Sequence, residues 1–409
     1  MSTSARDAAA PPFRFVAVLV LATALGPFAM QVFLPALPAI QEDFAVGAGT
    51  AQLVFSLSAF AIALATLFYG PISDRVGRRP ALIGGLLVYL AGSLACALAP
   101  SIGVLILGRI VQAAGGCAGL VLSRAIVRDL YGRERSATVL AYITMAMVAA
   151  PMVAPAFGGL LTDLSGWRSV FVAGVAVGAL ILLAVRAELA ETARGTGGSG
   201  PGGSGRGFAR LLRSPPFLGY ALQGAFSISV FFCFLAAAPY LMVRVMGRPA
   251  SEYGLMFVLV SAAFMAGNFA AARLTPRVGG DRMILAGSVG SLAGAVLMLV
   301  LLLAGSWTPW SVFLPTSLGA FAQGLAVPNT QAAFLSIDPQ AAGTASGLGG
   351  FLQMGIAAVA AQVVGSIQDG TPYPMAIGMT FCAAAALTAA LVALRHGRAS
   401  GVGRRHTGR

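Results

Sequence analysis

Residues 70–80 read GPISDRVGRRP and form a charged segment between two apolar runs, 50–71 and 80–99. Apolar runs of similar length recur along the whole chain, and a helix needs roughly 20 apolar residues to cross a bilayer. The composition agrees, because 58% of the 409 residues are apolar and only 10% are charged, whereas soluble domains are about a quarter charged. The sequence therefore predicts an all-α membrane protein with twelve transmembrane helices, over 14–36, 50–71, 80–99, 103–123, 136–161, 167–185, 216–241, 251–273, 281–303, 309–329, 341–367 and 373–394.

Charge is distributed unevenly among the segments that join these runs. All 26 basic residues are arginines, against 13 acidic residues. Counting alternate segments places 22 arginines on one side of the membrane and three, Arg168, Arg244 and Arg248, on the other. Because positively charged segments stay in the cytoplasm, we expect both termini to be cytoplasmic. The excess of arginine is therefore a topology signal, and the expected partner is the lipid bilayer, with no nucleic acid.

The chain divides into two halves of six helices each. Residues 195–207 read GTGGSGPGGSGRG, a composition typical of a flexible linker. The segment RVGRRPALIGG at 75–85 resembles RVGGDRMILAG at 277–287, 202 residues later. Repeated halves are the usual plan of secondary transporters. We expect two pseudo-symmetric bundles, with an N-terminal bundle over 1–190, a cytoplasmic Gly/Ser-rich linker over 191–213, and a C-terminal bundle with a cytoplasmic tail over 214–409.

The chain has few groups that would perform chemistry. Its two histidines, His396 and His406, lie in the tail. We find no carboxylate pair and no Walker loop. The four cysteines lie inside apolar runs without the spacing of metal ligands, so small buried side chains are expected there. The sequence predicts neither an enzyme nor a cofactor or metal site, and it names no catalytic residue.

Three motifs carry a resemblance to a known family. The segment at 70–80 resembles the signature loop of the major facilitator superfamily, G-x-x-x-D-R-x-G-R-R. RIVQAAGG at 109–116 is similar to the R-x-x-Q-G-x-G motif of its drug:proton antiporters, and Ala150-Pro151 with PAFGG at 155–159 resembles the antiporters' Gly/Pro-rich motif. Further stretches resemble the Bcr/CflA branch of bacterial multidrug exporters, namely LPALPAI at 34–40, SRAIVRDLYG at 123–132, GWRSVF at 166–171, VPNTQA at 327–332 and GFLQMG at 350–355.

The resemblance implies what the protein does. It implies a twelve-helix facilitator fold that exports small hydrophobic or amphipathic drugs, such as chloramphenicol-type or sulfonamide-type compounds, across the inner membrane. It also implies alternating access, protons as the coupling ion, and a monomer. A different-cargo alternative is an exporter or importer of a specific metabolite with other coupling. A membrane sensor without transport is an alternative from another class, although such proteins usually add a soluble domain.

The 70–80 segment supplies the candidate gating residues. Gly70 and Gly77 permit close packing and a tight turn. Asp74 can cap a helix N-terminus, and the resemblance assigns it to the start of the eleventh helix, near 341–345. Arg78 is expected to pair with Asp129, and Arg75 belongs to the same group. We expect these contacts to hold the halves together when the cavity faces outward. The alternative is that the arginines only keep this segment on the cytoplasmic side of the membrane. At the position of the second half that matches Asp74 the residue is Pro276, so we expect these contacts to form only from the first half.

Arg109 is an ionisable residue well inside an apolar run. A charge there costs about 2.5–3.5 kcal/mol on insertion scales, so it should face a polar cavity or the bundle interior. Gln112 lies one turn along the same face and can share hydrogen bonds with it. The resemblance links this arginine to proton movement, whereas a structural bond to backbone carbonyls is the alternative.

Gln31 marks a departure from the family pattern. Relatives read I-D-M-Y-L-P-A-L-P, and here the run is MQVFLPALP at 30–38, with Gln31 at the acidic position. A buried carboxylate can exchange a proton near neutral pH, and a glutamine cannot. Proton antiport therefore follows from the resemblance alone. Three alternatives follow from the absence of this carboxylate. A carboxylate at a helix end titrates instead, or the coupling differs from that of the family, or the cargo is neutral or anionic.

The substrate cavity should combine adaptable apolar side chains with a few polar ones. Each aromatic candidate alternatively faces lipid or a neighbouring helix. Glycine and proline in the fifth run should permit helix sliding or bending, at Pro151, Pro155, Gly158 and Gly159. The candidate cavity residues are Phe28, Gln31, Phe33, Gln112, Tyr142, Phe231, Phe232, Tyr240, Asn268, Asn329 and Gln353.

Overall fold

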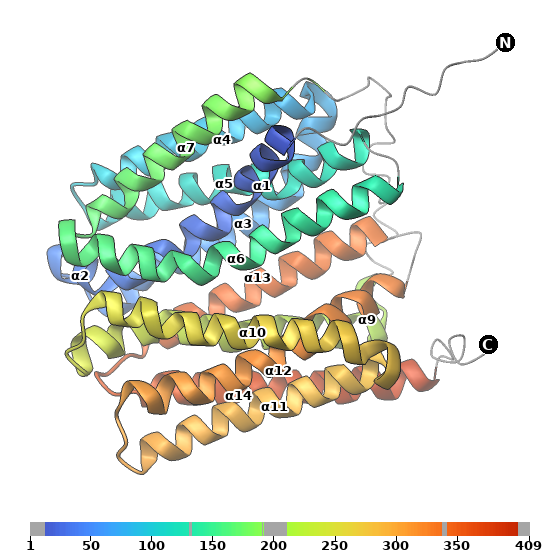
Figure 1. Cartoon of the computed structure of the whole chain (residues 1–409). Coiled ribbons are helices and arrows are strands. Elements are labelled where there is room, and N and C mark those ends of the chain that lie inside the picture. The colour runs from blue at the N-terminus through green and yellow to red at the C-terminus, as the bar shows by residue number, and fades with distance from the viewer. Residues whose placement is uncertain (1–12, 131–132, 190, 192–210, 338–341, 400–409) are drawn as a thin grey trace.

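The structure is a computed structural model that describes residues 13–130, 133–189, 191, 211–337 and 342–399. Over these residues it is helical and contains no strand. Twelve long helical segments lie side by side (Figure 1). Eleven are, over their described residues, long and apolar enough to cross a membrane, and α6 is the twelfth. The predicted all-α, twelve-helix fold class is confirmed.

Each half of the chain contributes six helical segments. The first half contains α1 (Phe13–Val32) with its continuation η1 (Leu34–Ala36) and α2 (Leu37–Asp43), then α3 (Ala48–Val76), α4 (Arg78–Ala97), α5 (Ile102–Leu130), α6 (Arg133–Ser165) and α7 (Arg168–Glu188). The second half contains α9 (Pro215–Tyr240) with its continuation η2 (Leu241–Val245), then α10 (Ala250–Val278), α11 (Gly280–Leu303), α12 (Pro309–Ser336), α13 (Ala342–Ser366) and α14 (Tyr373–Ala399).

The start of α1 and the end of α14 lie at the same end of the helices, which we call the near end (Figure 1). The opposite end, which includes α2, is the far end. The observed helices extend beyond several predicted runs at the near end. For example, α5 continues to Leu130 and α12 to Ser336, whereas their apolar runs end at 123 and 329. Backbone hydrogen bonding continues where hydropathy falls, so an apolar run underestimates the helix.

Proline shapes the first helical segment. Pro27 lies inside α1, but at Pro35 the α-helix has already ended and a short 3-10 turn follows. Proline lacks a backbone N–H and fits the first positions of a helix, which is where Pro35 and Pro38 lie. The chain therefore bends at the far end before α2.

The two halves repeat one local structure at the junction between their second and third helices. Gly77 has φ +99° and Gly279 has φ +91°, and each ends one helix and caps the next. This backbone region is readily available only to glycine. The internal repeat in the sequence therefore corresponds to a structural repeat, as two pseudo-symmetric bundles require.

The helices carry an apolar outer surface and an apolar interior. Large side chains such as Leu164 and Phe381 are 72% and 68% exposed, which suits a surface surrounded by lipid. The four cysteines are buried and free, as predicted. The chain folds as a multi-pass membrane protein.

The two halves meet along two helix pairs, α3 with α13 and α6 with α10. Figure 1 shows α6 of the first half beside α10 of the second. The linker predicted over 191–213 lies mostly outside the described residues, and the domain boundaries at 190 and 214 stay a prediction.

Candidate functional site

A cavity of about 230 Å³ lies between the two halves. Helices α1 and α6 contribute from the first half, and α9, α10 and α12 from the second. Most of its described wall is apolar, and ligand sites in general are mainly apolar with a few placed polar groups. The lining residues are Gln31, Met147, Pro151, Met152, Ile228, Phe231, Phe257, Val260, Ser261, Phe264, Ala320, Gln323 and Val327.

Aromatic rings form one side of this cavity. The centroids of Phe231 on α9 and Phe257 on α10 lie 5.9 Å apart, at an interplanar angle of 46°. Methionines on α6 lie in the same wall, and methionine adapts its shape to irregular surfaces. A wall of this kind can bind apolar molecules of differing shape.

Three lining side chains are polar, namely Gln31, Ser261 and Gln323. Gln31 is 8% exposed, and its Oε1 has no hydrogen-bond partner among the described residues. No described side chain in the wall is ionisable. The site therefore offers hydrogen bonds without charge.

Of the residues predicted to line the cavity, the structure places Gln31 and Phe231 there, together with Pro151 of the helix α6 motif. Two predicted phenylalanines pack elsewhere. Phe28 lies against Phe157, at a ring distance of 6.1 Å. Phe232 lies against Phe55 across the two halves, at 5.2 Å. Neighbouring positions on a helix point in different directions, so only one face of α9 reaches the cavity.

The predicted asparagines also lie outside the cavity wall. Asn268 donates to the carbonyl oxygen of Phe264, 3.0 Å away, and Asn329 donates to that of Leu325, at 2.8 Å. Asn329 also accepts from Thr275 Oγ1 at 3.1 Å. These amides are satisfied by the backbone of their own helix and need no polar chamber.

Gln353 and Tyr142 are two further predictions that the structure places outside the wall. Gln353 is buried against α9, where a Cβ atom on Gly224 would lie 2.5 Å from its Nε2. Tyr142 is 54% exposed on α6. A tyrosine can present its ring to lipid while its hydroxyl finds a polar partner.

Arg109 and Gln112 form a buried cluster inside the first half rather than part of the cavity wall. Arg109 is 1% exposed, and its Nη1 donates to Gln112 Oε1 and to the carbonyl oxygen of Ala29, 3.2 Å away. Its guanidinium lies 3.8 Å from the centre of the Phe33 ring. Gln112 Nε2 in turn donates to Ser93 Oγ at 2.8 Å. The cluster thus ties α5 to α1 and α4 through uncharged partners.

The segment at 70–80 comprises the end of α3, Gly77 and the start of α4, and it forms a charged group at the near end. Arg78 Nε lies 2.9 Å from Asp129 Oδ2, and Arg78 Nη1 lies 2.5 Å from Asp74 Oδ1. The Arg78–Asp129 pair named above is present in this structure. Asp74 pairs with Arg78 within the same half, while Arg75 is exposed. The start of the eleventh helix at 341–345 lies partly outside the described residues.

The two glycines of this segment, Gly70 and Gly77, differ in their surroundings. Gly77 has the positive φ described above, so the turn between α3 and α4 requires it. A Cβ atom on Gly70 would meet nothing within 4 Å. Close packing therefore does not explain Gly70 in this structure.

Glu191 also belongs to this near-end group, and our sequence reasoning did not include it. Its Oε1 accepts from the backbone N–H of Arg78 at 3.1 Å, the first residue of α4. A carboxylate at a helix N-terminus is favoured by the unpaired N–H groups and the helix dipole. Glu191 comes at the start of a Gly/Ser-rich stretch, where no periodic pattern indicates a contact.

The far end is closed by polar contacts between the halves. Arg244 Nη2 lies 2.9 Å from Glu42 Oε2 and 3.3 Å from the carbonyl oxygen of Pro38. Asp163 Oδ2 accepts from the backbone N–H of Ser251 at 2.9 Å, near the start of α10. None of these residues was predicted as a site residue, because each pairs with a position far away in the sequence.

Glycines let the helices approach closely beside these contacts. A Cβ atom on Gly159 would lie 2.5 Å from the carbonyl oxygen of Ala250 on the other half. The same atom on Gly158 would overlap the carbonyl oxygen of Val32 on α1. The neighbouring Pro155 contacts α10, its carbonyl oxygen lying 2.5 Å from the Cβ position of Gly254.

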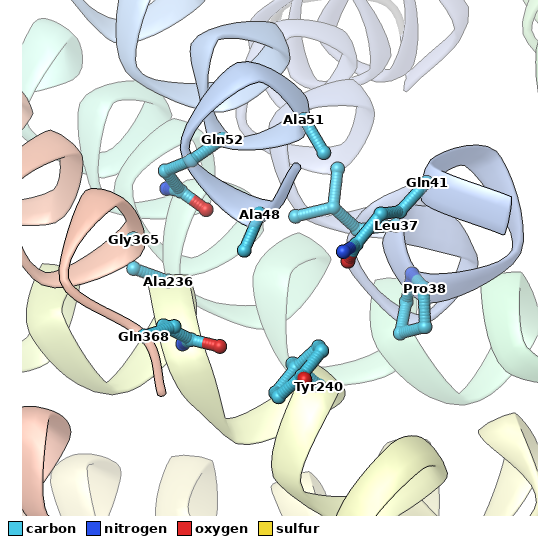
Figure 2. Close-up of a pocket in the computed structure, with 10 residues that line it drawn as sticks. All are labelled: Leu37, Pro38, Gln41, Ala48, Ala51, Gln52, Ala236, Tyr240, Gly365 and Gln368. Atoms are coloured by element: carbon cyan, nitrogen blue, oxygen red, sulfur yellow. The ribbon is translucent and has the colours of Figure 1, made fainter. Parts of the chain in front are cut away.

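A small pocket at the far end also joins the halves (Figure 2). Gln41 and Gln52 line it from the first half, and Tyr240 and Gln368 from the second. Gln52 Nε2 and Gln368 Oε1 are buried and have no hydrogen-bond partner among the described residues. Its volume of about 10 Å³ is too small for an organic molecule. Tyr240, predicted in the cavity, therefore belongs to the closed far end.

Comparison with known proteins agrees with the fold. The family model of the Major Facilitator Superfamily matches residues 19–362, so the chain belongs to that superfamily, whose members are transporters and not enzymes.

Several of its relatives are named as drug-resistance proteins. The chain is 28% identical over 373 residues to the bicyclomycin resistance protein homolog of Haemophilus influenzae, covering 90% of this chain and 93% of the relative. It is 28% identical over 341 residues to multidrug resistance protein D of Escherichia coli, covering 82% and 84%. The resemblance to Bcr/CflA-type multidrug efflux transporters is confirmed by these matches.

A solved structure shares the fold. A bacterial homologue of the human lysosomal transporter Spinster, crystallised in an inward-facing and unoccupied conformation, superposes with a TM-score of 0.75. The two chains are 17% identical, and the match covers 95% of this chain and 97% of the other. At this identity the likeness concerns the fold alone.

Proposed function

We propose that this protein exports small hydrophobic or amphipathic compounds, drugs among them, across the bacterial inner membrane by alternating access. The observation that carries the proposal is the mainly apolar cavity of about 230 Å³ enclosed by both halves. The resistance phenotypes named for its relatives support drugs as the cargo class. In the alternate state the contacts at the far end separate, and the cavity opens there.

The orientation belongs to the same proposal. The near end is cytoplasmic, as are both termini, because the arginine-rich segments of the sequence alternate with segments that hold only three arginines. The far-end contacts then face away from the cytoplasm. A single chain contains both halves and the whole described cavity wall, so the transporter works as a monomer.

Protons drive the export in this proposal. The described cavity wall has no ionisable side chain, so the carboxylates that titrate lie outside the wall. Asp74 and Asp129 at the near end, paired with Arg78, are candidates for coupling, and Arg109 is the buried charge next to α1. We propose that these groups link proton movement to the separation of the halves.

A susceptibility panel in an efflux-deficient bacterium tests the proposal. Cells that express the protein should show raised resistance to chloramphenicol-type and related compounds, and a protonophore should abolish the cellular efflux of those compounds. An Asp74→Asn variant should lose most of the resistance at an unchanged protein level. Efflux that survives the protonophore would contradict proton coupling. If the protein is present in the membrane but gives no resistance to any compound, export itself is contradicted.

A further inference from the structure

The few polar side chains in the mainly apolar wall of the cavity between the halves are uncharged. Its three polar side chains are two carboxamides and one hydroxyl, Gln31, Gln323 and Ser261. The ion pairs of the described residues lie at the helix ends. Arg109 is not among the described lining residues and packs on the Phe33 ring.

Gln31 is the polar side chain that the first half contributes to the described cavity wall. It is more than nine-tenths buried, and its Oε1 has no partner among the described residues. A buried polar atom without a hydrogen bond is unfavourable. A carboxamide oxygen accepts hydrogen bonds and does not titrate between pH 5 and 9. This oxygen is shielded from the cavity in the present conformation, and it gains a hydrogen bond when the Gln31 carboxamide turns toward a cargo molecule that brings a donor.

We infer that the cavity selects uncharged cargo that donates an N–H or O–H hydrogen bond to Gln31 Oε1 and lays its apolar part against Phe231 and Phe257. The inference rests on the export function proposed above. It makes Gln31 the specificity-determining residue of the site.

The physical reason for excluding cations is the cost of an unpaired charge in this wall. A cation transferred into the cavity loses its hydration and finds no carboxylate among the described lining residues. An uncharged molecule loses less hydration free energy on entering the cavity, and its donor regains a hydrogen bond at Gln31. The cavity volume of about 230 Å³ lies below that of usual ligand pockets, so the cargo is small.

Two probes of different charge test the inference. Chloramphenicol is uncharged and carries hydroxyl and amide donors, and tetraphenylphosphonium is a permanent cation without a donor. Resistance to each probe is measured in the efflux-deficient strain, and binding of each probe to purified protein is measured by titration. The proteins compared are the wild type, Gln31→Leu, Gln31→Glu and the control Gln223→Leu. Gln223 is a buried glutamine of α9 that bonds to Thr330 and Ser288 outside the cavity.

We expect wild type to export and bind chloramphenicol and not tetraphenylphosphonium. Gln31→Leu should weaken chloramphenicol binding about tenfold, the effect of one lost buried hydrogen bond. Gln31→Glu should weaken it too and gain tetraphenylphosphonium export. Gln223→Leu should lower resistance only in proportion to the amount of protein, with binding unchanged. Size-exclusion profiles of each variant identify any loss of fold.

Wild-type export of tetraphenylphosphonium overturns the inference while export as such stands. The inference also fails if folded Gln31→Leu binds chloramphenicol as wild type does. If the wild type exports no compound of the panel, the proposed function fails and the inference fails with it.

Discussion

Arg109 is the most deeply buried charged side chain among the described residues. Its described partners are uncharged, namely a backbone carbonyl, the amide of Gln112 and the ring of Phe33. A cation close to an aromatic face gains up to about 2 kcal/mol when desolvated. These interactions offset part of the cost of burying the charge, and the planar guanidinium is the group that can make all of them at once.

An Arg109→Lys variant should therefore lose function although it keeps the charge. Lysine cannot stack on Phe33 and donate to both oxygens in the same geometry. We expect chloramphenicol efflux to fall at least about tenfold, equivalent to ~1.4 kcal/mol, while the amount of protein in the membrane changes little. Transport into inverted vesicles at an imposed pH gradient is the measurement. A lysine variant with the efflux and the pH dependence of wild type would remove Arg109 from the coupling proposal.

Single residues show what the sequence could and could not predict about the site. Gln31 was selected as a polar side chain in an apolar helix, and it lies in the described cavity wall. The same argument selected Asn268 and Asn329, whose amides bond to carbonyl oxygens of their own helices in this structure. Gln112 was expected both near Arg109 and in the cavity, and only the first holds in this structure. The composition of a helix does not show which polar side chains form their hydrogen bonds with the backbone of that same helix.

At the scale of elements, α6 packs against both halves, on α1 in its own half and on α10 in the other. Its adjacent glycines face different neighbours, since Gly158 lies against α1 of its own half and Gly159 against α10 of the other half. Small residues at such positions allow backbones to approach closely in membrane proteins. A side chain added at Gly158 therefore affects the packing within the first half, and one added at Gly159 affects the contact between the halves.

A Gly158→Ala variant should lower stability. The new methyl group would overlap the Val32 carbonyl oxygen, which is backbone and cannot rotate away. Overpacking of this kind costs about 1–3 kcal/mol. We expect a melting temperature several degrees below wild type for the purified protein in detergent. Gly84→Ala in α4 is the matched control, because a methyl group there meets nothing within 4 Å and alanine favours a helix. Equal melting temperatures for the two variants would contradict the close packing of α6 on α1.

Hydropathy predicted where the helices lie, although α5 and α12 each extend seven residues beyond their apolar runs, and it did not predict the contacts between helices. Hydropathy gives the apolar length of α11 almost completely, from 281–303 predicted to Gly280–Leu303 observed. It gives no information on the pair Glu42 and Arg244, which join α2 to η2 across about two hundred residues. Nor did hydropathy indicate that Glu191 accepts a hydrogen bond from the first backbone N–H of α4. Such contacts depend on tertiary packing rather than on local pattern.

At the scale of the molecule, the two halves are held together along α3 with α13 and α6 with α10. Ser56 Oγ on α3 donates to Gln362 Oε1 on α13, 2.6 Å away, and Gln362 Nε2 donates to the carbonyl oxygen of Gly49 at 2.9 Å. The far-end ion pair is partly exposed, and pairs of this kind contribute roughly 0–1 kcal/mol. Closure by many weak contacts is what a transporter needs if its halves are to separate in each cycle.

A chemical cross-link across the far end tests this account most directly. In the double variant Glu42→Cys and Arg244→Cys, the two thiols replace groups 2.9 Å apart, and the four native cysteines are buried. After reaction with a short reducible bifunctional thiol reagent, we predict that inverted vesicles no longer transport chloramphenicol, and that transport returns when a reductant cleaves the link. The same treatment should leave wild-type vesicles unaffected. Unchanged transport with the far end cross-linked would contradict alternating access between these two halves.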